Sequence, residues 1–188
     1  TFANEGVYIK PQFITRIEDK NGVVIYEPST ESHDVLNKDI AFAVIKLLEG
    51  VTEGGSGARL RTQGGGHGYN RVTGYPYVFT NPIAGKTGTT QNQSDGWFMG
   101  MVPNLAAGVW VGCEDRSARF KGITYGQGAT AALPIWAIFM KKCYADETLT
   151  VSKTDVERPA NLSIKVDCWA PPVQDTVAAE QDTQEIGL

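Results

Sequence analysis

The stretch Ile83-Ala84-Gly85-Lys86-Thr87-Gly88-Thr89-Thr90 decides the fold. Its β-branched residues favour extended backbone, so it predicts a strand rather than a helix. Two further apolar runs follow at residues 96–102 and 105–112, and only Pro103-Asn104 separates them. So short a connection predicts that these two strands pair antiparallel. We therefore expect an antiparallel sheet of at least three strands.

Two predicted helices flank these strands. The first begins at Asn37, whose side chain can cap it, and Asp39 complements the positive end of its dipole. Gly50 is placed to end this helix. The second runs from Leu133 to about Tyr144, with Pro134 in its first turn or at a kink. The apolar residues of the first helix fall on one stripe: Ile40, Ala43, Val44, Leu47 and Leu48. We expect helices to pack on the antiparallel sheet, which gives an α/β fold of the α+β type.

A hairpin precedes the first helix. Its two apolar runs are residues 12–18 and 23–26, and Asp19-Lys20-Asn21-Gly22 between them carries the Asn-Gly signal of a tight turn. Two glycine-rich loops follow later in the chain. The loop at 54–74 predicts either a ligand-facing rim or a flexible connector, and the loop at 122–128 is a candidate neighbour of the strand at 83–90.

The triplet Lys86-Thr87-Gly88 belongs in part to two known motifs. A phosphate-binding loop requires G-x-x-x-x-G-K-[ST], but its first glycine falls on Thr80, and Pro82 lies inside the loop. That motif also opens a helix, whereas β-branched residues surround this triplet. The sequence therefore favours the other candidate, the K-T-G element of penicillin-interacting serine enzymes.

Several further segments of the chain resemble one protein family in their residues and in their order along the chain. They are residues 1–11 (TFANEGVYIKP), 17–22 (IEDKNG), 85–90 (GKTGTT), 94–100 (SDGWFMG), 109–112 (VWVG), 134–136 (PIW) and 139–140 (FM). Together the chain resembles class A penicillin-binding proteins, in the C-terminal part of their transpeptidase domain. The resemblance extends to about residue 144 and implies a penicillin-binding and β-lactamase-like fold.

The resemblance implies roles for four residues of the motif. Lys86 would place a positive charge beside the nucleophile and the substrate carboxylate. The hydroxyls of Thr87 and Thr89 would donate to that carboxylate, and the Thr89 N–H would help to stabilise the tetrahedral oxyanion. Gly88 removes a side chain where substrate lies against the strand. Lys86 and Thr89 are thus the predicted catalytic residues, and Thr87, Gly88 and Thr89 the predicted substrate-binding residues.

The chain departs from the family in its serines. The family's nucleophile is the Ser of S-x-x-K, and a second motif, S-x-N, supplies proton-shuttling groups. None of the seven serines has Lys three residues on or Asn two residues on. In the family both motifs lie upstream of the segments found here. We therefore expect this chain to carry the substrate-carboxylate strand without the nucleophile, and to be inactive alone.

The absence of the S-x-x-K and S-x-N motifs also affects the expected stability of the chain. The first strands of the sheet would be absent together with the two motifs, which would leave an apolar face and a strand edge open. Such a chain should be marginally stable or should self-associate. Residues 1–150 are the expected part of the transpeptidase domain. Residues 151–188 are an extension, in which residues 162–166 predict one short strand and residues from 171 an acidic, disordered tail.

Composition excludes several classes of protein. The 188 residues have a formal net charge of −4, which resides in residues 171–188 because the acids and bases of the rest balance. Nothing in this balance favours a nucleic-acid partner. The longest nearly apolar stretch, residues 129–140, is too short to cross a bilayer. No two cysteines have CxxC spacing, which argues against a zinc finger or a thioredoxin-type site. We expect no metal and no cofactor.

The resemblance also implies partners and location. The parent protein would be a membrane-anchored D,D-transpeptidase on the periplasmic side, which cross-links peptidoglycan stem peptides through an acyl-serine. β-Lactams would acylate the same serine. This location would permit a Cys143–Cys168 disulfide, although unpaired cysteines also pack as small hydrophobes. Two alternatives remain: a non-catalytic penicillin-binding-like module, or a D,D-carboxypeptidase or β-lactamase relative.

The residues after the motif have a structural interpretation. Ser94 and Asp95 predict a turn in which the Asp side chain bonds its own backbone, and Trp97 predicts a buried residue of the next strand. The functional alternative is support of the cleft. The charged residues 114–121, which include Arg116, predict a solvated loop.

Overall fold

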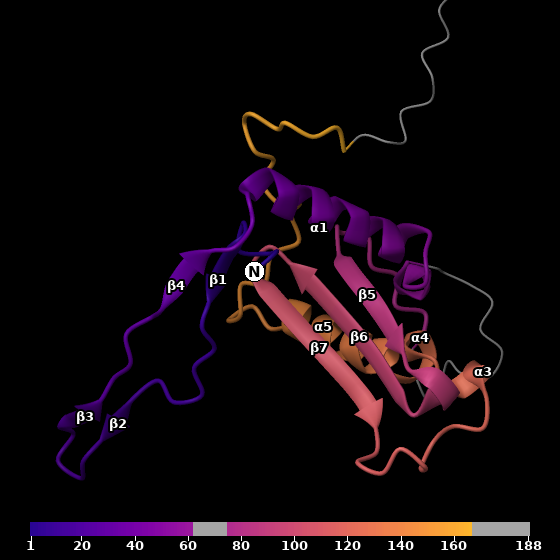
Figure 1. The fold of residues 1–188 in the computed structure, drawn as a ribbon, viewed down its shortest axis with the longest axis horizontal. Helices are drawn as coiled ribbons and strands as arrows, with labels where there is room; N and C mark the ends of the chain where they lie inside the picture. Colours follow the sequence, from indigo (N-terminus) through magenta and orange to yellow (C-terminus); the bar gives the residue numbers. More distant parts are fainter. Residues whose placement is uncertain (62–74, 167–188) are drawn as a thin grey trace, which may run out of the picture.

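The computed structural model describes residues 1–61 and 75–166. They form a three-stranded sheet with helices packed against it, and a thin arm of two two-stranded ribbons (Figure 1). The sheet contains β5 (Ala84–Thr89), β6 (Asp95–Val102) and β7 (Leu105–Gly112) in the order β5-β6-β7, with a short 3-10 turn, η2 (Gln91–Gln93), before β6. Both pairings are antiparallel. The mixed helix and antiparallel sheet confirm the predicted fold class and the three predicted strands.

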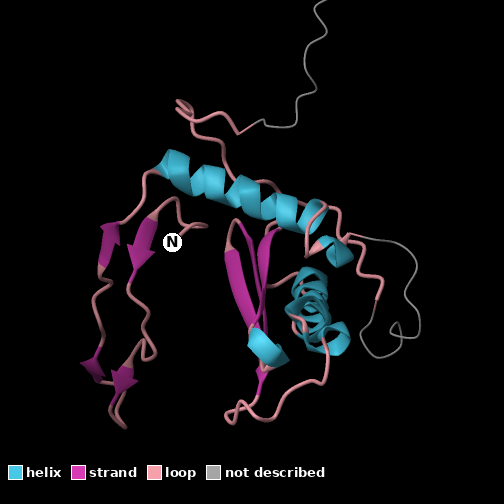
Figure 2. Ribbon diagram, turned by 45° about the vertical axis from the view of Figure 1, so that its right-hand side comes forward, coloured by secondary structure: helices cyan, strands magenta, loops and turns pink. Residues whose placement is uncertain are grey.

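The helices that follow β7 cover one side of the sheet (Figure 2). Short helices α3 (Ile123–Gly126) and α4 (Gly128–Ala131) lead into α5 (Leu133–Ala145), which has Pro134 in its first turn as predicted. Trp136 of α5 is fully buried, and its indole N–H donates to the Ala107 carbonyl at 3.1 Å. Gly100 makes room for this ring, because a Cβ there would lie 2.4 Å from it. The core comprises Leu60, Tyr77, Phe79, Ile83, Phe98, Val102, Ala132, Leu133, Trp136, Ala137 and Met140.

Helix α1 (Lys38–Glu53) crosses the end of the sheet near β5 (Figure 1). Its predicted cap is confirmed, since the Asn37 side chain accepts from the Asp39 N–H at 2.9 Å. The predicted end at Gly50 is wrong: the helix continues to Glu53. The predicted stripe is not the buried face either, and Leu47 is 73% exposed. The buried residues are Ala41, Phe42, Ile45, Glu49 and Thr52. The face of α1 that carries Ala41, Phe42 and Ile45 is buried instead, because α1 packs on β5 with this face.

Two residues after position 151, Asp155 and Ser163, contact α1. The Lys46 ammonium donates to Glu49 at 3.0 Å and to Asp155 at 2.7 Å, which pairs the buried Glu49 with a cation. Asp39 accepts from both the N–H and the hydroxyl of Ser163. The strand predicted at residues 162–166 is wrong, because the described part of this range has no regular structure. The predicted acidic tail, Cys168 and residues 62–74 lie outside the described residues. Cys143 is buried and has no disulfide partner within residues 1–61 and 75–166.

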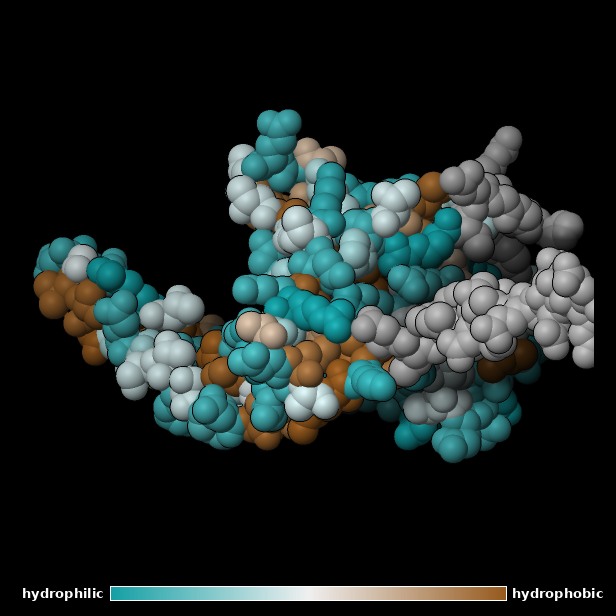
Figure 3. Space-filling view, turned by 90° about the horizontal axis from the view of Figure 1, so that it is seen from above, coloured by the Kyte–Doolittle hydropathy of each residue, from teal (hydrophilic) through white to brown (hydrophobic). Residues whose placement is uncertain are grey.

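The arm extends away from the sheet. Strand β1 (Val7–Ile9) pairs with β4 (Ser32–Asp34), and β2 (Ile17–Glu18) pairs with β3 (Val24–Tyr26). The predicted hairpin is confirmed: the Asp19 carboxylate accepts from the N–H groups of Asn21 and Val23, both at 2.8 Å, and Gly22 supplies the positive φ of the turn. The β1–β4 pairing was not predicted. Apolar surface is exposed at the end of this arm (Figure 3).

Candidate functional site

The K-T-G motif lies on β5, the edge strand of the sheet. Side chains alternate along a strand, and residues directly opposite each other share a face. Lys86 lies opposite the exposed Met99, whereas Thr87 lies opposite the buried Phe98. Lys86 therefore faces the open side of the sheet, and the hydroxyls of Thr87 and Thr89 face the side that carries α4 and α5. Residue 88, a glycine, faces the open side without a side chain.

Each hydroxyl of the motif has one partner in the described residues. Thr87 Oγ1 lies 2.7 Å from Ser56 Oγ, and either atom can be the donor. Ser56 belongs to the turn between α1 and the 3-10 helix η1 (Ala58–Leu60). Thr89 Oγ1 accepts from the Gly128 N–H at 3.0 Å. The Lys86 ammonium is exposed and donates to the Thr87 carbonyl at 2.9 Å. The structure thus brings the two threonines together on one face and leaves the lysine on the other.

The loop at residues 122–128 borders the motif, as predicted. Gly128 starts α4 directly against the sheet: a Cβ there would lie 2.4 Å from the Gly88 carbonyl oxygen and 2.2 Å from the Trp97 carbonyl oxygen. On its other side, α4 accepts a hydrogen bond at Ala129 O from Arg59 of η1, at 3.1 Å. The position of α4 against β5 is therefore fixed from two sides.

Asp95 closes the end of the motif strand. Its carboxylate accepts from the Trp110 indole N–H at 3.0 Å, from the Thr90 hydroxyl at 3.0 Å and from the Ser94 hydroxyl at 3.2 Å. These bonds, led by the one from Trp110, hold the pKa of Asp95 below its ordinary value. The predicted bond from Asp95 to its own turn backbone is replaced by this side-chain cluster. Arg116, placed by prediction in a solvated loop, reaches Asp95 at 3.5 Å.

The predicted burial of Trp97 is wrong. Trp97 is 43% exposed and its ring centre lies 6.3 Å from that of Trp110 on the open side of the sheet. The neighbouring Phe98 is the buried residue, because the two-residue period of the strand turns one of each adjacent pair away from α5. Sequence patterning predicted the strand but not which of its faces would be covered.

Neither a cluster of metal ligands nor a membrane-spanning helix accompanies the motif in the described residues. Within residues 1–61 and 75–166, no three His, Cys, Asp or Glu side chains lie together as metal ligands would. No helix in the same ranges is long and apolar enough to cross a membrane.

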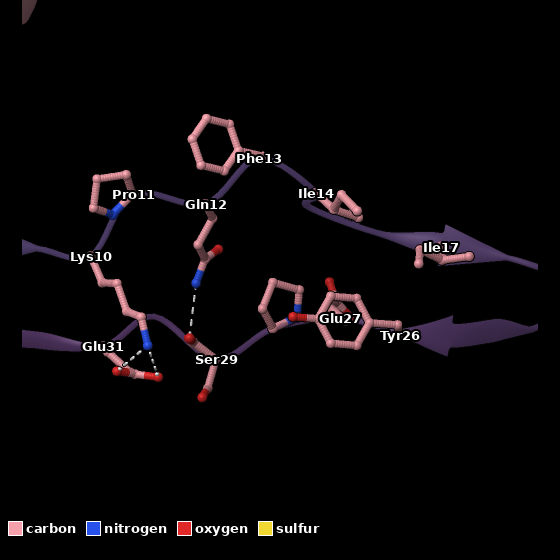
Figure 4. A pocket seen from close by; sticks show the side chains of 11 residues that line it. Lys10, Pro11, Gln12, Phe13, Ile14, Ile17, Tyr26, Glu27, Ser29 and Glu31 are labelled. Atoms are coloured by element: carbon pink, nitrogen blue, oxygen red, sulfur yellow. Dashed lines mark hydrogen bonds and ion pairs between the residues drawn. The ribbon is translucent and has the colours of Figure 1, made fainter.

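A groove of about 690 Å³ lies in the arm, lined by residues that include Phe13, Ile17 and Tyr26, with Lys10 bridging to Glu31 (Figure 4). None of its lining residues belongs to β5, so it is separate from the motif.

Sequence comparison agrees with these features. Residues 1–131 match the family model described as "Penicillin binding protein transpeptidase domain". The chain is 35% identical over 140 residues to penicillin-binding protein 1A of Aquifex aeolicus, which covers 74% of the chain and 17% of that protein. It is 34% identical over 153 residues to penicillin-binding protein 2D of Bacillus subtilis, covering 80% and 20%. The chain spans about a fifth of the length of these relatives.

Structural comparison supports the same fold. The penicillin-binding protein PonA1 of Mycobacterium tuberculosis superposes with a TM-score of 0.65 at 23% identity, covering 92% of this chain and 42% of that chain. The matching family model covers well over half of the chain, and it includes the whole of β5, β6 and β7. The chain therefore belongs to the transpeptidase-domain family of penicillin-binding proteins.

Proposed function

We propose that this chain supplies the substrate-binding strand of a peptidoglycan D,D-transpeptidase within a longer protein. One observation carries the proposal: an edge strand of a transpeptidase domain presents an exposed ammonium, Lys86, and two hydroxyls, Thr87 and Thr89. An edge strand leaves its outer backbone N–H and C=O groups free to bind an extended peptide. The Thr87 and Thr89 hydroxyls share one face of the strand and suit the terminal carboxylate of such a peptide, whereas the Lys86 ammonium lies on the other face and supplies positive charge for the nucleophile.

The proposed chemistry is acyl transfer through a serine. The serine oxygen gives up its proton and attacks the peptide carbonyl, and the amide bond breaks as the departing amine takes up a proton and leaves. The acyl group then passes from the serine to an acceptor amine, and the serine oxygen regains a proton. Lys86 provides positive charge beside the nucleophile, and the Thr89 N–H stabilises the oxyanion. The serine of an S-x-x-K motif is outside this sequence, so the 188-residue chain is inactive alone. Residues 1–150 form the part of the domain that contains the strand.

The parent protein acts outside the cytoplasm, on the periplasmic side of the membrane, where its substrate is located. Its partners are peptidoglycan stem peptides, and β-lactams react with its serine in place of them. Membrane anchoring belongs to parts of the parent beyond this chain. The family description, which names penicillin binding and transpeptidation, supports these assignments.

Labelling with a fluorescent penicillin tests the proposal. We expect a covalent adduct on the longer protein that contains this sequence, and none on the 188-residue chain. In the longer protein, Lys86→Ala should slow labelling by about 10²-fold, because the site loses the positive charge beside the nucleophile. Lys20→Ala is the matched control, because Lys20 is an exposed lysine of the hairpin turn. A stoichiometric adduct on the 188-residue chain, or wild-type labelling of Lys86→Ala, would contradict the proposal.

The isolated chain should also self-associate. The open side of the sheet exposes Trp97, Met99 and Trp110, each more than 40% accessible, and the outer edge of β7 has no strand beside it in the described residues. Apolar faces and free strand edges pair with further chains. In the longer protein we propose that the rest of the domain covers this face, and in the isolated chain a second copy does. Light scattering should find oligomers of the 188-residue chain and monomers of the parent domain; a monomeric 188-residue chain at high concentration would contradict this.

A further inference from the structure

Thr87 and Thr89 have the same side chain but different hydrogen-bond partners. The partner of Thr87 is the Ser56 hydroxyl, which can either donate or accept. The partner of Thr89 is a backbone N–H, that of Gly128, which can only donate. The Thr89 oxygen must therefore be the acceptor in this bond. Its own hydrogen points elsewhere, and within residues 1–61 and 75–166 the structure places no acceptor against it.

Because of this difference, the direction of the hydrogen bond is determined for Thr89 but not for Thr87. A hydroxyl group has one hydrogen to donate, and the exposed Thr89 keeps this hydrogen for a ligand. The bond from Gly128 occupies one lone pair of the Thr89 oxygen and leaves its hydrogen available to an acceptor, of which an ionised carboxylate is the strongest. Thr87 and Ser56, by contrast, can exchange donor and acceptor roles and accommodate either kind of group.

Only glycine permits this arrangement at residue 128. A Cβ would lie 2.2 Å from the Trp97 carbonyl oxygen and 2.4 Å from the Gly88 carbonyl oxygen, distances that would force α4 away from the sheet. The neighbouring Gly96 contributes to the same close approach, since a Cβ there would lie 3.4 Å from the Gly128 Cα. A shift of α4 by even a few tenths of an ångström lengthens the 3.0 Å bond to Thr89.

We infer that Gly128 is a positioning residue, which orients the Thr89 hydroxyl so that its hydrogen points to the ligand and thereby strengthens the preference of the site for carboxylate-bearing ligands. This inference rests on the proposed function and adds a residue that neither the motif nor its neighbours in sequence indicate. Gly128 touches no substrate itself; it acts through Thr89.

The experiment uses the longer protein and two ligands, benzylpenicillin and its methyl ester, which lacks the negative charge. The quantity measured is the ratio of their second-order acylation rates. We expect Gly128→Ala to lower this ratio about tenfold, mainly by slowing the acid. Thr89→Val should do the same, Thr89→Ser should retain the ratio, and the double variant Gly128→Ala with Thr89→Val should lose no more than either alone. Gly122→Ala is the control, because a Cβ there meets open space in the same loop.

The outcomes separate the two proposals. If the wild-type protein is not acylated at all, the proposed function fails. If it is acylated but Gly128→Ala slows both ligands equally, Gly128 is merely structural and the inference is overturned. Should Gly128→Ala not fold, amide hydrogen exchange decides: the Gly128 amide should lose protection in Thr89→Val and keep it in Thr89→Ser. Equal protection in both variants would also overturn the inference.

Discussion

The sheet and the arm are both built from antiparallel strands, yet only the sheet has a buried face. Phe98 and Trp136 are fully buried between β6 and α5, whereas Phe13 of the arm is 100% exposed. A two-stranded ribbon has no core of its own, so turn chemistry and backbone pairing alone define its shape. The motif residues lie on the sheet, where helices fix the strand from behind. The placement of the Thr87 and Thr89 hydroxyls therefore depends on packing more than on strand pairing.

The largest expected effect comes from removing the packing behind the sheet. Trp136→Ala deletes a fully buried indole and its hydrogen bond to Ala107, and should lower the free energy of unfolding by about 3–5 kcal/mol. Urea unfolding followed by circular dichroism measures this. Trp97→Ala is the matched control on the open side of the same sheet, and should cost about 1 kcal/mol or less. Equal losses for the two tryptophans would show that the sheet has no preferred packed face.

A smaller loss should follow from overfilling the same interface. Gly100→Ala places a methyl group 2.4 Å from the Trp136 ring, and should cost about 1–3 kcal/mol. Gly50→Ala is the control, since residue 50 lies inside α1 with open space beside it, and alanine there should stabilise the helix by up to about 1 kcal/mol. If Gly100→Ala is neutral in urea unfolding, the ring is not held against this glycine.

Asp95 connects the end of the motif strand to β7, and its effect should depend on pH. Because hydrogen bonds lower its pKa in the folded state, its stabilisation is complete above about pH 5 and is lost as pH falls through the folded value. The urea midpoint of the wild-type chain should therefore fall further between pH 7 and pH 3 than that of Asp95→Asn. Asp115→Asn, in the exposed loop after β7, is the comparison variant for a carboxylate outside the cluster. Parallel pH profiles for wild type and Asp95→Asn would contradict a role for this carboxylate in closing the strand.

The smallest effect should come from the arm. Phe13 is fully exposed, so Phe13→Ala should change the free energy of unfolding by no more than about 0.5 kcal/mol. The measurement is the same urea titration. A loss comparable with that of Trp136→Ala would mean that the arm is packed against something in solution and that the contrast between arm and sheet is false.

Turn and capping residues, which act over a few positions of the chain, made part of this structure predictable. Asn21-Gly22 indicated the hairpin turn, Pro103-Asn104 the tight connection of β6 to β7, and Asn37 the start of α1, because each acts over a few residues. What covers a face is not local. The burial of Phe98 rather than Trp97, and the choice of the Ala41 face of α1 over the Leu47 face, depend on elements that pack there from elsewhere in the chain.

The candidate site likewise has one part that the sequence predicted and another part that it did not. Lys86-Thr87-Gly88 is a contiguous motif, and its position on a strand followed from the β-branched residues around it, whereas the structure shows that this strand is at the edge of the sheet. The partners of its hydroxyls did not: Ser56 is 31 residues before Thr87, and Gly128 is 39 residues after Thr89. A glycine-rich loop at 122–128 was a signal that something approaches a strand closely, but only the structure identifies Gly128 as the residue that contacts it.

Reconstitution from two pieces tests most directly whether this chain contributes the substrate strand and lacks the nucleophile. The preceding part of the parent domain, with its S-x-x-K serine, is expressed separately, mixed with the 188-residue chain, and labelled with fluorescent penicillin. We predict that label appears only in the mixture, on the upstream piece, and that Lys86→Ala in the 188-residue chain slows its appearance about 10²-fold. Label on the 188-residue chain, or labelling of the mixture that is indifferent to Lys86, would contradict the proposed division of the active site.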